Sequence, residues 1–174
     1  MVTRSYMSRR EVEQQSFSPA VALLVPLAAI LLQVYLPKIA PVMTILDLPL
    51  IVTLFFAVSR RSPIAGTVTG GAIGLLQDIL TSQYIGVNGM AKSAIGYAAA
   101  SLGSQIDVEN TATRALLSFG FSLVQSVLLY LIERRMLGIA AFHLLWLHEL
   151  LRAVANTAVA IPVFLLLDRW KRQE

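Results

Sequence analysis

The sequence predicts an all-α fold, a polytopic membrane helix bundle of about six transmembrane helices. Apolar residues make up 56% of the 174 residues and charged residues only 14%, and the mean hydropathy is +0.70. A chain of this composition has too few polar side chains to cover a water-facing surface. Glycine also recurs at every fourth position of an apolar stretch, residues 66–74, which is typical of helices that pack closely in lipid.

Six apolar segments approach the length of about 20 residues that a bilayer crossing needs. They are residues 19–36, 42–58, 64–80, 88–104, 113–132 and 150–168. We expect the first to be a retained signal anchor, because no small-residue cleavage site follows it. Asp47 and Pro49 lie inside the second, where they suit the N-cap and the first turn of a helix that starts at the interface. Residues 136–148 are too short to cross alone and predict an interfacial or re-entrant helix.

The basic residues lie mainly at the edges of the apolar segments and therefore predict an orientation. With both termini in the cytoplasm, most arginines and lysines fall on the inner side. The exceptions are Lys38, Arg134 and Arg135. We expect residues 1–17 to form a cytoplasmic N-terminal tail and residues 18–168 to form a single membrane domain. Residues 169–174 are expected to form a basic cytoplasmic tail.

The glycines of the third span share one face of the helix. Residues four apart lie nearly above one another, so the ridge comprises Gly66, Gly70, Gly74 and, one step further, Asp78. The fourth span carries a similar stripe of small and polar residues that includes Gly96. The ridge predicts either packing against another helix of the same chain or docking of a transmembrane helix from a partner protein.

Two charges flank the short connection between the third and fourth spans. Asp78 lies about one turn before the connection and Lys92 about one turn after it. In an antiparallel hairpin they should lie at a similar depth, close enough to form an intramembrane charge pair. Ionisable groups at the centre of a bilayer cost ~2.5–3.5 kcal/mol on insertion scales. Two interpretations are open. The pair either has the structural role of holding the hairpin together, or one or both charges face a cavity or a partner helix.

Further polar side chains inside the spans are candidates for lining a cavity or contacting a partner: Asn88, Tyr97, Arg152 and Asn156. Asn156 is expected to hydrogen-bond to another helix or to bind a ligand. Glu149 precedes Arg152 by three residues, so these two charges are expected to neutralise one another on one helix face. The fifth span has a mild polar stripe, expected to form interhelical hydrogen bonds, at Ser118, Ser122 and Gln125.

The sequence predicts no catalytic, cofactor or metal site. It has no cysteine, which excludes disulfides and thiolate chemistry. His143 and His148 are five residues apart and do not share a helix face. The usual hydrolase, zinc-protease and phosphate-loop motifs are absent from the sequence. The basic residues are accounted for by membrane orientation, so no nucleic-acid partner is expected.

Three segments within residues 47–103 carry a resemblance to a known family. They are the run Asp47–Val58, the glycine-repeat segment Gly66–Asp78, and the turn Tyr84-Ile-Gly86 followed by Asn88, Lys92 and Gly96-Tyr97. Together they resemble the rod shape-determining protein family MreD. The last two spans add nothing specific to this resemblance.

The resemblance implies a non-enzymatic component of the bacterial inner membrane that belongs to the machinery for lateral cell-wall elongation. It implies a fold similar to the six-helix substrate-binding subunits of energy-coupling vitamin transporters. The implied direct partner is MreC, a single-span scaffold protein. The wider complex would include MreB, RodZ, the glycosyltransferase RodA and a class B penicillin-binding transpeptidase. The resemblance carries over no catalytic residue.

Two other functions remain open at the level of sequence. The chain could be a small-molecule, vitamin-type binding subunit of a membrane transporter, with a cavity near the outer face. The aromatic residues available for such a cavity are Tyr84, Tyr97, Phe142 and Trp146. A role in flipping or binding membrane lipid is the third reading.

Overall fold

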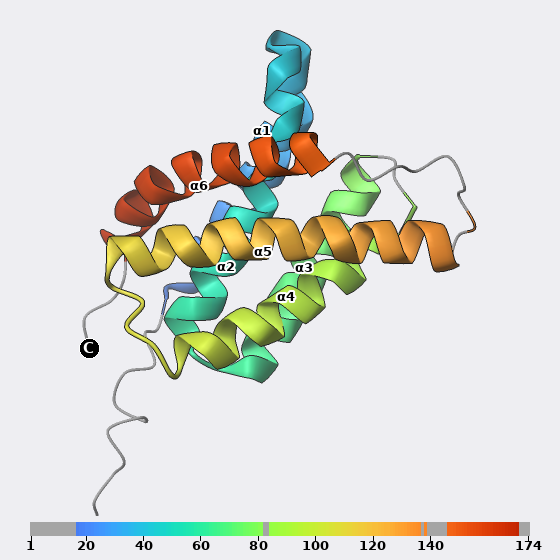
Figure 1. Cartoon of the computed structure of the whole chain (residues 1–174). Coiled ribbons are helices and arrows are strands. Elements are labelled where there is room, and N and C mark those ends of the chain that lie inside the picture. Colours follow the sequence, from blue (N-terminus) through green and yellow to red (C-terminus); the bar gives the residue numbers. More distant parts are fainter. Residues whose placement is uncertain (1–16, 82–83, 137, 139–145, 171–174) are drawn as a thin grey trace, which may run out of the picture.

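The computed structural model of the chain describes residues 17–81, 84–136, 138 and 146–170. These residues form six α-helices (Figure 1). In Figure 1, α5 and α6 lie across the front of the other helices, while α2, α3 and α4 run at a steep angle behind them. The predicted all-α bundle is therefore confirmed.

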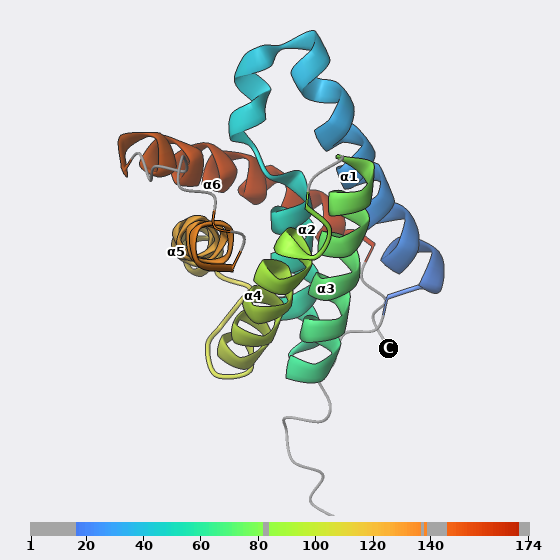
Figure 2. The same ribbon diagram turned by 90° about the vertical axis from the view of Figure 1, so that its right-hand side faces the viewer.

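Helix α1 (Pro19–Ile39) begins behind the N-cap Ser18, whose Oγ accepts a hydrogen bond from Val21 N at 3.3 Å. The predicted end at Leu36 is wrong, because the helix continues through Pro37 to Ile39. The Leu36 carbonyl still accepts from Ala40 N at 2.9 Å, so the last turn closes past the proline. The chain then returns through a short 3₁₀ helix, η1 (Pro41–Ile45), and forms an arch above the other helices (Figure 2).

Helix α2 (Leu48–Arg60) begins later than the predicted span 42–58. Asp47 is its N-cap, and Leu50 N donates to Asp47 Oδ1 at 2.9 Å. Pro49 lies in the first turn, so the capped start expected from the sequence is confirmed. All eleven residues from Pro49 to Ser59 are buried, which makes α2 the central helix of the bundle.

Helices α3 (Pro63–Leu80) and α4 (Val87–Gly103) form an antiparallel hairpin close to the predicted boundaries. Figure 2 shows the two helices side by side along their length. We call the end of the bundle at the α2–α3 junction the Arg61 end, and the end at the α3–α4 turn the Gly86 end. Gly86 adopts φ 99° at the start of α4, a left-handed conformation that glycine tolerates without strain.

Helix α5 (Thr111–Leu131) ends in a short π-helical segment, η2 (Ile132–Met136). Helix α6 (Trp146–Asp168) begins four residues earlier than the predicted span 150–168. Most of the predicted interfacial helix over 136–148 lies outside the described residues.

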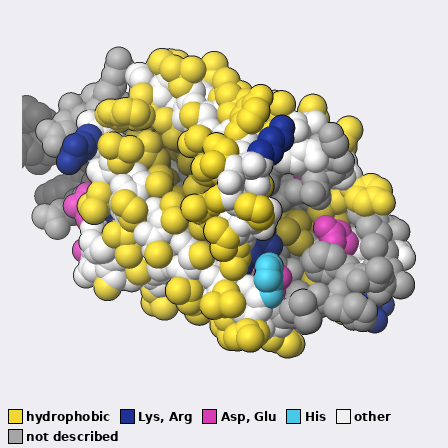
Figure 3. All heavy atoms as spheres, turned by 90° about the horizontal axis from the view of Figure 1, so that it is seen from above, with side chains coloured by type: hydrophobic (Ala, Val, Ile, Leu, Met, Phe, Trp, Pro, Cys, Tyr) yellow, Lys and Arg dark blue, Asp and Glu magenta, His cyan; other side chains and the backbone are white. Residues whose placement is uncertain are grey.

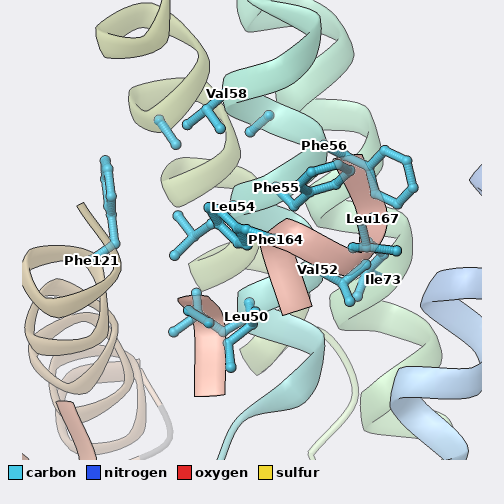
Figure 4. Packing of buried hydrophobic residues seen from close by; sticks show 14 of the residues in the cluster. Leu50, Val52, Leu54, Phe55, Phe56, Val58, Ile73, Phe121, Phe164 and Leu167 are labelled. Carbon is cyan, nitrogen blue, oxygen red and sulfur yellow. The ribbon is translucent and has the colours of Figure 1, made fainter. Parts of the chain in front are cut away.

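The hydrophobic core is centred on α2 and contains a group of aromatic rings that pack edge-to-face. The rings of Phe55 and Phe164 are 5.4 Å apart, and those of Phe17 and Phe56 are 5.0 Å apart. Figure 4 shows Phe55, Phe56 and Phe164 packed together with aliphatic side chains from α2, α3 and α6. Edge-to-face pairs add about 0.5–1.5 kcal/mol to the burial of their area. This cluster therefore ties the beginning of α1 and the end of α6 to the Arg61 end of α2.

Three of the helices are long and apolar enough to span a membrane: α1, α5 with η2, and α6. Crossing by α2, α3 and α4 stays a prediction. Large hydrophobic side chains remain exposed on all three long helices, as at Leu23 (67%), Leu116 (73%) and Val154 (57%). Seen from above, hydrophobic side chains cover most of the surface, with few charged groups between them (Figure 3). An apolar surface of this extent fits lipid rather than water.

Candidate functional site

The glycine ridge of α3 lies directly against the backbone of α4. A Cβ atom added to Gly70 would lie 2.1 Å from the Lys92 carbonyl oxygen, and one added to Gly74 would lie 2.3 Å from that of Asn88. Gly66 and Gly96 face one another, and an added Cβ on either would come within 2.3 Å of the other's carbonyl oxygen. No side chain fits in these positions. The ridge is therefore filled by α4, and it is not open to a helix of another protein.

Asp78 holds the turn between α3 and α4. Its fully buried carboxylate accepts hydrogen bonds from Gly86 N at 2.9 Å, from Gly89 N at 3.3 Å and from both the backbone and the side-chain amide of Asn88. These donors lie at the N-terminus of α4, where the orphan backbone N–H groups and the helix dipole favour an anion. The hydrogen-bonding capacity of the Asp78 carboxylate is thus satisfied by donors from the α3–α4 turn.

The predicted pairing of Asp78 with Lys92 is wrong. Lys92 Nζ forms an ion pair with Asp47 Oδ2 at 3.1 Å, and it donates to Asn88 Oδ1 at 3.2 Å. Asn88 in turn donates to Asp78 at 2.8 Å, so the Asn88 amide lies between the two charges of the hairpin. Asp78 already receives its donors from the turn, and the lysine side chain reaches across to the N-cap of α2 instead.

Asp47 is the central residue of this site, and sequence reasoning assigned it only a capping role. Besides Lys92 and Leu50, its carboxylate accepts a hydrogen bond from the Gln125 side-chain amide on α5. Arg152 of α6 lies 3.7 Å away. One signal in the sequence could have identified Asp47. A carboxylate within an apolar segment is costly unless a cation or hydrogen-bond donors contact it.

Asn156 completes the network from α6. Its Oδ1 accepts from the backbone N–H of Asp47 at 2.9 Å, and its Nδ2 donates to Ser122 Oγ at 3.2 Å. The interhelical hydrogen bonding expected of Asn156, Ser122 and Gln125 is therefore confirmed. The same expectation for Ser118 is wrong, because its buried hydroxyl has no hydrogen-bond partner among the described residues. The cluster Asp47, Lys92, Gln125 and Asn156, which we call the Asp47 cluster, joins α2, α4, α5 and α6 at buried positions.

Gln33 of α1 was not identified from the sequence, although it fixes the chain where it enters α2. Its Nε2 donates to the Leu46 carbonyl at 2.8 Å, and its Oε1 accepts from Leu48 N at 3.0 Å. A glutamine that satisfies two backbone groups in this way keeps the irregular segment before α2 from leaving orphan polar atoms. The α1 helix is thereby linked to the same end of the bundle.

A polar cavity of about 270 Å³ lies next to the Asp47 cluster at the Gly86 end. Its walls come from five helices and the segment around η1. The residues lining it are Gln33, Thr44, Leu46, Asp47, Gln77, Thr81, Asn88, Leu129, Glu133 and Arg152. Two of the predicted polar residues, Asn88 and Arg152, therefore face this cavity, while Asn156 lies behind it.

The aromatic residues expected for a ligand cavity lie elsewhere. Tyr84, Tyr97 and Trp146 are 60%, 57% and 69% exposed, and none of them lines the polar cavity. Phe142 lies outside the described residues. Tyr97 instead borders an open apolar groove of about 610 Å³ on the outer face of the α3–α4 hairpin. This groove is lined by Thr67, Gly71, Leu75, Gly86, Gly89, Met90, Ser93, Ala94 and Tyr97.

A second ion pair lies at the Arg61 end of the bundle and joins α5 to α6. The guanidinium of Arg114 forms an ion pair with Asp168, donates to the Val108 carbonyl at 2.6 Å and lies over the ring of Phe164. These contacts join the start of α5 to the end of α6. Within the described ranges, no group of three or more His, Asp and Glu side chains is placed to hold a metal ion.

Comparison with known proteins gives one finding. The family model described as rod shape-determining protein MreD matches residues 14–170. No curated protein and no solved structure matches the chain. The family match covers all six helices, including α5 and α6, for which the sequence alone gave no specific resemblance.

Proposed function

The chain belongs to the MreD family of rod shape-determining proteins, and from this premise we propose that it is a non-enzymatic component of the bacterial cell-elongation complex. In this role it binds MreC and positions peptidoglycan synthesis through docking of transmembrane helices. The family is a shape-determining one and is not known for catalysis. MreB, RodZ, RodA and a class B penicillin-binding transpeptidase would belong to the wider complex.

The observation that carries this proposal is the open groove on the outer face of the α3–α4 hairpin. Its floor contains the small residues Gly71, Ser93 and Ala94, and exposed hydrophobic side chains such as Val68 (66%) flank it. Without a hydrophobic driving force between helices in lipid, association depends on close backbone approach over small residues. A single transmembrane helix, such as that of MreC, has the shape and chemistry that this groove accepts.

The positions of the two described ends of the chain support a proposed orientation of the bundle. Ser18 and Trp170 border the same apolar pocket at the Arg61 end, so the two described ends of the chain lie together. Arg60, Arg61 and Arg114 lie at this end as well. We place the Arg61 end at the cytoplasmic face of the inner membrane, in agreement with the positive-inside rule.

The experiment that tests the docking surface places leucine in the groove. Gly71→Leu and Ala94→Leu should reduce co-purification of MreC and convert rod-shaped cells to rounded ones. A side chain at position 71 meets first the flexible Ser93 hydroxyl at 2.6 Å rather than backbone, and Ala94 is exposed, so the fold should tolerate both changes. Ala158→Leu, at an exposed position of α6, is the matched control. Unchanged MreC binding by well-folded groove variants would contradict the proposal.

A vitamin-type binding subunit of a transporter is the second candidate, and the polar cavity is the observation in its favour. Its volume of about 270 Å³ is below the ~300–1,000 Å³ of ordinary ligand pockets, and the aromatic side chains expected for it lie elsewhere. Native mass spectrometry of the purified protein distinguishes the two functions, because a stoichiometric vitamin would support the transporter reading.

A further inference from the structure

The polar cavity at the Gly86 end contains hydrogen-bonding groups that the described part of the chain leaves unused. We propose that it binds the phosphoethanolamine headgroup of a membrane phospholipid. The ligand is recognised through its primary ammonium by Glu133 and Gln77 and through its phosphate by Arg152. This inference is independent of the docking groove, which lies on the outer face of the α3–α4 hairpin.

The Gln77 amide is the first of the unused groups. Gln77 is only 8% exposed and lines the cavity, yet its Oε1 atom is buried and has no hydrogen-bond partner. A buried amide oxygen without a partner loses the hydrogen bonds that it made to water in the unfolded chain. Such a group in a polar cavity indicates a missing donor.

Glu133 supplies a negative charge beside the same cavity. It makes no ion pair or hydrogen bond with another described residue, although Arg152 is near enough to act on it electrostatically. The neighbouring carboxylate of Asp47 is already taken by Lys92 and Gln125. Glu133 and Gln77 together therefore offer a free anion and a free acceptor, the groups that a primary ammonium satisfies with its three donors.

Arg152 supplies the opposite charge. Its guanidinium is 3.7 Å from Asp47 and 3.8 Å from Glu149. Both contacts are ion pairs longer than a hydrogen bond, and the Arg152 side chain is 23% exposed, so its N–H donors can still reach a ligand. A guanidinium presents five donors in a fixed fork that matches a phosphate group. Among the described residues that line the cavity, Arg152 is the one cation.

The charged groups of the site carry both signs. Two carboxylates and one guanidinium line the cavity, Lys92 pairs with Asp47, and Glu149 pairs with Arg152. A zwitterionic headgroup can therefore place its ammonium against a carboxylate and its phosphate against the guanidinium. Leu32 and Leu80 are each next to a lining residue along the chain, and Leu131 lies between the lining residues Leu129 and Glu133; the three are 50%, 42% and 45% exposed. We assign these exposed leucines to contact with the acyl chains.

The test measures lipid retention by the full chain. Purified protein is incubated with micelles containing equal amounts of phosphatidylethanolamine, phosphatidylcholine and phosphatidylglycerol with identical acyl chains, and bound lipid is counted by native mass spectrometry. We expect one retained phosphatidylethanolamine and little of the other two. Choline has no N–H donor for Glu133 and Gln77, and phosphatidylglycerol has no ammonium.

Glu133→Gln should reduce this preference about tenfold, because a charge-assisted hydrogen bond is lost. Glu109→Gln changes an exposed carboxylate near the Arg61 end and should leave lipid retention unchanged. Equal retention of the three lipids by the wild-type protein would overturn the inference, as would a Glu133→Gln variant with full selectivity. Soluble phosphoethanolamine bound as tightly as the lipid would overturn the lipid as the source. A retained phosphatidylethanolamine supports the inference whether or not MreC binds.

Discussion

Lys92 and Asp47 form a buried ion pair, with 3.1 Å between Nζ and Oδ2 and side-chain exposures of 0% and 2%. The pair joins the second turn of α4 to the N-cap of α2, 45 residues earlier in the chain. The Asp47 carboxylate also accepts a hydrogen bond from Gln125 of α5, and the Asp47 backbone N–H donates to Asn156 of α6. One residue thus contacts four helices and fixes their relative positions.

Removing the lysine charge should destabilise the bundle strongly. Lys92→Met removes the closest cation of the buried Asp47 carboxylate and leaves it with the more distant Arg152 at 3.7 Å, and breaking a buried pair costs about 3–5 kcal/mol. Asp47→Asn keeps a capping side chain and should lower the penalty when combined with Lys92→Met. Thermal unfolding of the single and double variants in detergent measures the coupling. Additive losses in this cycle would show that the two charges do not interact.

The glycine ridge should not accept even a methyl group. Gly70→Ala places a Cβ 2.1 Å from the Lys92 carbonyl oxygen, so the two helices must separate and the protein should lose stability or fail to fold. Gly120→Ala in α5 is the matched control, because nothing lies within 4 Å of the added Cβ. That control should be neutral or stabilising by up to about 1 kcal/mol through helix propensity. Similar melting temperatures for both variants would contradict the close packing of α3 and α4.

Replacing Asn156 by leucine should leave the Asp47 N–H without an acceptor. An unsatisfied buried donor costs about 1–3 kcal/mol, and Ser122 loses a donor at the same time. Thr157→Val, one residue further along α6, removes only a hydroxyl bonded to the Ala153 carbonyl and should change stability by less than about 0.5 kcal/mol. The two variants are compared by unfolding in the same detergent. A larger loss for Thr157→Val would argue against the importance of the network.

The sidedness of the bundle can be measured directly because the sequence has no cysteine. Single cysteines are introduced at Tyr84, at the Gly86 end, and at Glu109, near the Arg61 end; both positions are exposed. In intact spheroplasts, a membrane-impermeant maleimide should label Tyr84→Cys, whereas Glu109→Cys should react only after permeabilisation. The reverse pattern would invert the proposed orientation.

The sequence predicted the helices more accurately than their contacts. The hairpin boundaries, the Asp47 cap and the contact role of Asn156 follow from local rules, because caps, prolines and four-residue spacings act within one or two turns. The end of α1 was misjudged because Pro37 lies in the last turn, where the helix tolerates it. The late start of α2 followed from the irregular segment that Gln33 holds in place.

The partner of Lys92 could not be deduced from the same rules. Proximity along the chain favoured Asp78, but the choice depends on which way α4 is rotated and on how many donors each carboxylate already has. Asp78 is satisfied by the N-terminus of α4, a property of the folded turn. Successive members of the Asp47 cluster are separated by 31 to 45 residues in sequence, so only the packing of whole helices reveals their association.

The position of Asp47 early in the chain has a consequence for biosynthesis. Its capping contact with Leu50 is available at once, but Lys92, Gln125 and Asn156 leave the ribosome one after another. The Asp47 carboxylate therefore lacks Lys92 until α4 is made, and the Asp47 backbone N–H lacks its acceptor until α6 is made. A translation product that stops before α6 would carry that defect permanently, and it would be a natural target for membrane quality-control proteases.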